Sequence, residues 1–143
     1  AAFSAKVRDV SEYLASIGAA PPQGRIDAAV TYHNPCHLSR PGKINGQPRS
    51  LLRGIPGVEL RELGEADWCC GGAGTYNVAH YDQSMQVLDR KMKNVERSGA
   101  SILATSCPAC IMQLSHGARR AGLEVEVLHV TELLDRAAAA SEK

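Results

Sequence analysis

Residues 100–122, ASILATSCPACIMQLSHGARRAG, contain a complete strand-to-helix unit and indicate the class of fold. The segment 100–105 is short and apolar and ends at a turn, which is typical of a buried strand. From residue 107 the apolar residues recur at helical spacing; Pro108 lies near the first turn, where its missing N–H costs little, and Gly122 ends the helix. The expected inner face of this helix carries Ile111, Leu114, Ala118 and Ala121.

Strands and helices alternate in the same way along the chain from residue 27 onward. Strands are predicted at 28–32, 58–63, 100–105 and 123–129. Helices are predicted at 3–17, 49–53, 75–98, 107–121 and 130–140, with a linker at 19–26, a loop over most of 35–49 and Thr131 as the cap of the last helix. This order predicts a three-layer, Rossmann-like α/β fold, in which helices cover both faces of a four-stranded, mostly parallel sheet.

The composition limits the classes of protein to which the chain can belong. Its 143 residues are enough for one domain, and we treat 1–143 as a single unit. Lysine and arginine total 16 and aspartate and glutamate total 15, a balance that argues against nucleic-acid binding. No apolar stretch reaches the length of a membrane span, and no secretory signal is visible. Because the sequence opens without methionine, we expect a domain excised from a longer protein.

The cysteines follow the predicted strands. Cys36 comes after the first strand, Cys69 and Cys70 after the second, and Cys107 and Cys110 after the third. In a parallel sheet all strand-to-helix junctions fall on one edge, at the carboxyl ends of the strands. We therefore expect all five thiols to meet in one crevice. Five thiols cannot all pair as disulfides, and without a secretory signal a reducing compartment is the default.

Metal binding accounts for more of these cysteines than the other thiol chemistries do. A disulfide between Cys69 and Cys70 would be strained, and a redox pair within residues 107–110 would leave the other three thiols unexplained. Structural zinc takes four ligands, whereas a cluster of several irons can use all five. Helices beginning after Cys70 and at residue 107 would point N–H groups at the sulphurs, and Gly71 and Gly72 allow close backbone approach.

Several neighbouring residues are candidates for the surroundings of the centre. His33 and His37 flank Cys36 and are candidates for hydrogen bonds to the centre or for ligation. Trp68 is either a shield against water or a core aromatic. Weaker candidates near the same edge are Tyr76, Asn77 and His129. Met85 and Met92 fit core spacing, and His80 and His116 are expected to face solvent.

Three stretches resemble a known family. They are YHNPCHLSR (32–40), ADWCCGGAGTYN (66–77) and ATSCPACIMQLSHG (104–117). The cysteine spacing resembles that of the cysteine-rich CCG domain, which occurs in the B-type subunit of heterodisulfide reductase and in the iron–sulphur subunits of glycolate oxidase, lactate utilisation enzymes and anaerobic glycerol-3-phosphate dehydrogenase. The residues around the cysteines are most similar to those of the C-terminal CCG domain of the glycolate oxidase iron–sulphur subunit.

The resemblance implies a ligand set and a function. It implies that Cys36, Cys69, Cys70, Cys107 and Cys110 hold a [4Fe–4S] cluster, noncubane in the heterodisulfide reductase type. The domain would transfer electrons in a complex that oxidises a 2-hydroxy acid such as glycolate, and with no visible flavin site it is not expected to act as an enzyme alone. Two alternatives stay open: disulfide chemistry at the same cluster, and a structural zinc-binding interaction module.

The same resemblance implies partners and a location. The partners would be an FAD-containing hydroxy-acid dehydrogenase subunit and an upstream ferredoxin-like domain. The implied location is the cytoplasm, with peripheral placement at the inner face of the membrane through partner proteins as an alternative.

Overall fold

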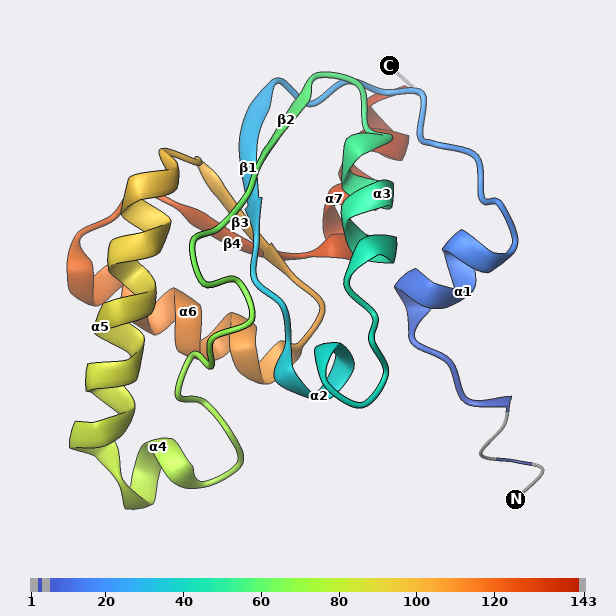
Figure 1. The fold of residues 1–143 in the computed structure, drawn as a ribbon. Coiled ribbons are helices and arrows are strands. Elements are labelled where there is room, and N and C mark those ends of the chain that lie inside the picture. The colour runs from blue at the N-terminus through green and yellow to red at the C-terminus, as the bar shows by residue number, and fades with distance from the viewer. Residues whose placement is uncertain (1–2, 4–5, 142–143) are drawn as a thin grey trace.

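The computed structural model describes residue 3 and residues 6–141, and helices cover both faces of its central sheet (Figure 1). The strands are β1 (Ala28–Tyr32), β2 (Val58–Arg61), β3 (Ile102–Thr105) and β4 (Glu126–His129). They form one sheet in the order β2-β1-β3-β4, and all neighbouring strands run parallel, with Val30 opposite both Leu60 and Ile102. The predicted fold class is confirmed, and the sheet is wholly parallel.

The order of the strands creates a switch point between β1 and β3. From β1 the chain passes through a helix on one face of the sheet to reach β2, whereas β3 lies on the other side of β1 and leads to a helix on the opposite face (Figure 1). In open parallel sheets, loops that diverge in this way leave a crevice at the carboxyl ends of the strands. The segments that contain Cys36 and Cys107 leave the sheet at this point, so the topology brings them together.

Two apolar clusters, one on each face, join the helices to the sheet. The helices are α1 (Val10–Ser16), α2 (Cys36–Ser39), α3 (Gly46–Arg53), α4 (Tyr76–Ala79), α5 (Tyr81–Ser98), α6 (Pro108–Ala121) and α7 (Val130–Ala140). The α5–α6 cluster contains Met85 and Met92, as predicted, together with Cys70, Cys107 and Cys110. The cluster on the α3–α7 face is built of aliphatic side chains and Tyr32. Three of the cysteines thus lie at the edge of a hydrophobic core.

The first helix is shorter than the spacing of its apolar residues predicted. It begins at Val10, because the side chain of Asp9 accepts a hydrogen bond from the Ser11 N–H at 2.8 Å and caps the helix there. Phe3 and Val7 lie outside it and are exposed. Residues 4 and 5 of the expected helix lie outside the described residues.

Other element boundaries also differ from the predictions. The stretch 35–49, predicted mostly as loop, contains α2 and the start of α3. The predicted helix 75–98 is interrupted at His80, whose backbone (φ −132°, ψ 53°) is not helical. The last helix is capped by His129 rather than by Thr131, because the Thr131 N–H donates to His129 Nδ1 at 3.2 Å. On α6, Ala121 is exposed and does not belong to the inner face.

The length and apolar character of a helix decide whether it could span a membrane. Among the residues that the structure describes, none of the helices combines the length and the apolar character needed to cross a membrane.

The packing of α6 against α5 can be tested at Leu114, which is completely buried in the α5–α6 cluster. We expect Leu114→Ala to lower the free energy of unfolding by about 2–5 kcal/mol, because it removes buried methyl groups and leaves a cavity. Met112→Ala on the same helix is the control, since Met112 is 74% exposed. Urea denaturation under reducing conditions measures both; equal losses in the two variants would contradict this packing.

Candidate metal centre

A cavity of about 230 Å³ lies between the segments that follow β1, β2 and β3. Its lining comes from every strand-to-helix junction that carries a cysteine, and it comprises His33, Cys36, His37, Cys69, Cys70, Gly72, Ala73, Gly74, Cys107, Ala109 and Cys110. The prediction that the five cysteines converge on one crevice is confirmed. All five are free thiols in the structure.

The cysteines reach the cavity from different local structures. Cys36 is the first residue of α2, and Cys69 and Cys70 lie in the loop between β2 and α4. Cys107 is the N-cap residue of α6, and Cys110 lies in the first turn of that helix. Cys70, Cys107 and Cys110 are buried, whereas Cys36 and Cys69 are half-buried. The cavity therefore has three deep thiols and two nearer the surface.

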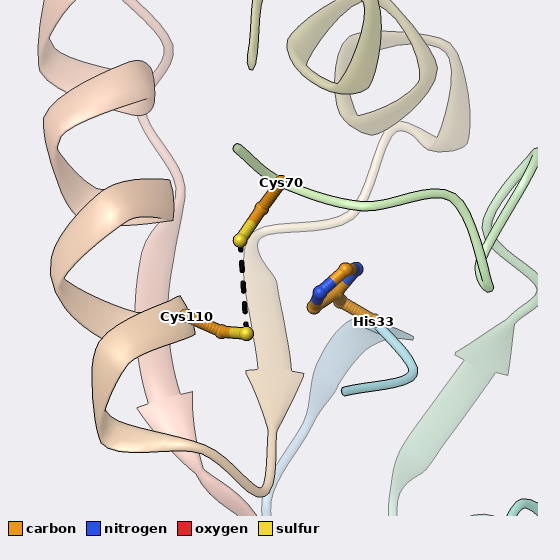
Figure 2. Close-up of side chains that lie close together, drawn as sticks. All are labelled: His33, Cys70 and Cys110. Atoms are coloured by element: carbon orange, nitrogen blue, oxygen red, sulfur yellow. Dashed lines mark hydrogen bonds between the residues drawn. The ribbon is translucent and has the colours of Figure 1, made fainter. Parts of the chain in front are cut away.

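The deepest part of the cavity brings together His33, Cys70 and Cys110 (Figure 2). The sulphurs of Cys70 and Cys110 are 3.6 Å apart, and these three residues offer ligand atoms that all lie within 4.8 Å of one another. Two sulphurs bound to one tetrahedral ion at about 2.3 Å would lie roughly 3.8 Å apart. The observed spacing is too long for a disulfide and suits two ligands of one metal ion.

His33 is the clearest sign that a bound group belongs in this cavity. Its side chain is 1% exposed, and its Nδ1 has no hydrogen-bond partner among the described residues. A buried ring nitrogen without a partner is costly. Burial, followed by the charge of Lys91, lowers the pKa of His33 to about 3, so the imidazole is neutral near pH 7. A neutral imidazole beside thiol sulphurs is a donor set that fits a metal centre.

The environment of Cys69 and Cys70 favours the protonated form of both thiols. The pKa of Cys70 rises to about 12, chiefly because its thiol donates a hydrogen bond to Cys110. The hydrogen bond with Cys70, followed by burial, raises the pKa of Cys69 well above its usual value. The Gly71 N–H opposes this shift by donating to Cys69 Sγ at 3.3 Å. Binding of a metal centre here would therefore release thiol protons.

The loop that carries Cys69 and Cys70 is held by helices α5 and α6. Ser84 Oγ donates to the Gly71 carbonyl at 2.9 Å, and Gln113 Nε2 donates to Ser84 Oγ at 3.0 Å. Gly71 has a φ of +87°, and a Cβ on it would lie 2.7 Å from the Ser84 carbonyl oxygen. A Cβ on Gly72 would lie 2.8 Å from Gln113 Cβ. These glycines therefore allow the cysteine loop to pack closely against helices α5 and α6.

The segment after β1 is fixed by hydrogen bonds to three other segments. The His33 N–H donates to the Ala104 carbonyl at 2.9 Å, and the Asn34 N–H donates to the Ala66 carbonyl at 3.0 Å. Arg49 Nη1 donates to Asn34 Oδ1 at 2.8 Å. These bonds hold His33 and Cys36 at the cavity.

Sequence analysis missed the polar residues that support the site. Ser84 and Gln113 are buried on helix faces that are otherwise apolar, as is Lys91. Arg49 begins the short helix predicted at 49–53, but no role at the site was predicted for it. The available signal was a polar residue at a position where helical spacing predicts an apolar one.

Some candidate residues lie away from the cavity. Trp68 is 43% exposed, and its ring lies under Arg90, whose Cζ is 4.3 Å from the ring centroid; it is neither core nor cavity lining. Asn77 Nδ2 donates to Gln113 Oε1 at 3.4 Å, so it supports the cavity wall. His129 caps α7. His116, expected to face solvent, is half-buried.

The support of the cysteine loop can be tested by matched glycine variants. We expect Gly71→Ala to lower the free energy of unfolding more than Gly74→Ala does. Both glycines have positive φ, at a cost of about 1–2 kcal/mol for an alanine, but a Cβ on Gly74 meets no atom within 4 Å. Urea denaturation of the metal-free protein measures both variants. Equal destabilisation would show that the Ser84 contact does not constrain the loop.

Comparison with known proteins gives one family and several relatives. The model of the family described as "CCG: Cysteine-rich domain" matches residues 30–115. The chain is 37% identical over 142 residues to the "Probable glycolate oxidase iron-sulfur subunit" of Bacillus subtilis (strain 168), covering 96% of this chain and 32% of that protein. It is 30% identical over 132 residues to "Lactate utilization protein A" of Halalkalibacterium halodurans, covering 92% of this chain and 54% of that protein.

A third relative is named as a subunit of a fumarate reductase. The chain is 31% identical over 132 residues to the B-type subunit of the fumarate reductase (CoM/CoB) of Methanothermobacter marburgensis, covering 92% of this chain and 27% of that protein. The chain thus spans between about a quarter and just over half of the length of these relatives. The resemblance seen in the cysteine spacing is confirmed, and the chain belongs to the cysteine-rich CCG domain family.

Proposed function

We propose that this domain binds an iron–sulphur cluster through its five cysteines and transfers electrons in a complex that oxidises a 2-hydroxy acid. The observation that carries the proposal is the convergence of five free thiols and the buried His33 on one cavity. Relatives named as a glycolate oxidase iron–sulphur subunit and as lactate utilization protein A support the hydroxy-acid context.

The ligands in this proposal are Cys36, Cys69, Cys70, Cys107 and Cys110, and the group they hold is a [4Fe–4S] cluster, noncubane where all five bind. Such a cluster, when bound, supplies reversible one-electron transfer. The number of thiols favours a cluster over zinc, because a tetrahedral zinc ion is saturated by four ligands.

The chain itself contributes the burial of three cysteines and a hydrogen bond to the sulphur of a fourth. Cys70, Cys107 and Cys110 are buried beside an apolar core, so this side of the cavity keeps water away from the centre. The Gly71 N–H already donates to Cys69 Sγ, and hydrogen bonds to thiolate sulphur stabilise the charged form. His37 and Cys36, nearer the surface, form the open side from which electrons enter or leave.

A second candidate function is reduction of an organic disulfide to two thiols at the same centre, with two electrons supplied one at a time by a partner subunit and two protons taken from solvent. Two observations favour it: Cys36 and Cys69 are half-buried, and one relative is named as a subunit of a fumarate reductase (CoM/CoB). A change in the paramagnetic signal of the loaded domain on addition of an organic disulfide would distinguish this function from electron transfer alone.

The proposed partners follow from the names of the relatives. Two of these relatives are named as subunits, which supports a complex. We propose an FAD-containing dehydrogenase subunit as the electron donor and a ferredoxin-like domain of the same iron–sulphur subunit as a neighbour. The proposed location is the cytoplasm, or the inner face of the membrane through these partners.

Metal and sulphide analysis tests the proposal. After anaerobic purification from cells supplied with iron, we expect about four irons and four sulphides per chain, a brown colour and a paramagnetic signal in one redox state. The isolated domain should not oxidise glycolate. Colourless protein with stoichiometric zinc, prepared in the same way, would contradict the proposal.

A variant series tests the ligand role of Cys70. We expect Cys70→Ser to lower the iron content per chain, because a hydroxyl replaces a buried thiol ligand. Ala109→Ser is the control, since it adds a hydroxyl to the cavity lining and removes no sulphur. Iron content equal to that of the unmodified protein in Cys70→Ser would remove Cys70 from the ligand set.

A further inference from the structure

Lys91 is a completely buried lysine on α5, with 0% of its surface exposed. Its ammonium donates a hydrogen bond to the backbone carbonyl of Glu65, in the segment that leads to Cys69 and Cys70. Among the described residues, no ion pair joins Lys91 to a carboxylate, although surface arginines do form such pairs. A buried ammonium with one neutral acceptor is an incomplete arrangement.

The surroundings of Lys91 place it behind the wall of the cysteine cavity. Its neighbours along α5, Leu88 and Met92, belong to the same buried cluster as Cys70 and Cys110. Its charge also acts on His33, whose pKa it helps to lower. Lys91 thus contacts the segment that leads to Cys69 and Cys70 from a fully buried position on α5.

The charge balance around Lys91 points toward the thiols. Burial lowers the pKa of Lys91 to about 8, and Cys70, Glu65, Asp67 and Cys69 oppose that shift wherever they carry negative charge. Both of those carboxylate residues are exposed, so solvent screens them. Among the described residues no carboxylate pairs with Lys91, so an anionic centre in the cysteine cavity would supply its missing buried counter-charge.

We propose that Lys91 is the counter-charge of the anionic, thiolate-ligated centre bound in the cysteine cavity. The inference rests on the proposed function and adds a residue that is not a ligand. Thiolates make the centre negative, and the buried ammonium stabilises that charge in a medium of low dielectric constant. Reduction adds a further negative charge, so Lys91 stabilises the reduced form more than the oxidised form and raises the reduction potential.

Lys91→Gln is the most informative variant, because glutamine keeps an N–H donor for the Glu65 carbonyl but removes the charge. Lys91→Arg keeps the charge, and Lys91→Met serves as a second neutral variant. Lys93→Gln on the exposed side of α5 is the matched control. Each protein is loaded anaerobically with ferrous iron and sulphide, checked for folding by circular dichroism, and analysed for iron content and for the midpoint potential of its paramagnetic signal.

We expect both neutral variants either to show a lower midpoint potential than the unmodified protein or, if folded, to lose iron, while Lys91→Arg and Lys93→Gln behave as the unmodified protein does. The thermal midpoint of Lys91→Met should fall more in the loaded protein than in the metal-free protein, because among the described residues no carboxylate pairs with the ammonium and the bound centre would supply its counter-charge. Unmodified potential and iron content in Lys91→Gln would overturn the inference, and so would equal losses in Lys91→Arg and Lys91→Gln.

The same experiment separates this inference from the proposed function. If the unmodified protein takes up no iron and sulphide, the proposed function fails and the inference fails with it. If the unmodified protein loads and the neutral variants match it in potential and iron content, the inference alone fails.

Discussion

The carboxyl ends of parallel strands share one edge of a sheet, and this geometric constraint underlies the whole site. Between Cys36 and Cys110 the chain crosses the sheet through helices on both faces, yet every cysteine-bearing loop returns to the same edge. β2 and β3 lie on opposite sides of β1, so the segments after β1 and β3 turn toward opposite faces of the sheet. This divergence opens space for a ligand between the first and last cysteine groups. If β1 or β3 ran antiparallel to the other strands, the cysteines that follow it would lie at the opposite edge of the sheet.

The site gathers polar groups that a hydrophobic core alone would not retain. Cys70 and Cys110 place their sulphurs side by side, His33 leaves a ring nitrogen without a partner, and Lys91 holds a charge without a buried anion. The ring nitrogen without a partner and the unpaired charge each carry an energetic cost in the metal-free protein. One anionic metal centre held by the cysteines would relieve both costs together, because it offers a hydrogen-bond partner to the His33 ring and a negative charge to Lys91. This shared explanation is stronger than any of the features taken separately.

Periodicity and topology rules were sufficient for the sheet and for the convergence of the cysteines, because both depend on patterns that extend over many residues. The sequence predictions failed at the ends of helices, because local hydrogen bonds set those ends. The Asp9 side chain starts α1 at Val10, and His129 caps α7 in place of Thr131. Trp68 lies at the surface with its ring against the guanidinium of Arg90, a contact that the spacing of residues along the sequence does not predict.

The support of the site was the part least visible in the sequence. Ser84, Lys91 and Gln113 interrupt apolar helix faces, and a periodicity analysis treats such interruptions as noise. In the fold they hold the loop of Cys69 and Cys70 from behind. Polar residues at core positions that face a cysteine loop are therefore a usable signal once the topology is known.

Anomalous diffraction from crystals of anaerobically prepared protein tests the central claim most directly. Data collected on both sides of the iron absorption edge should show iron inside the cavity, bonded to Cys70 and Cys110 and extending toward the other three cysteines. An empty cavity in iron-supplied protein, or a signal at the zinc edge in the place of iron, would contradict the account.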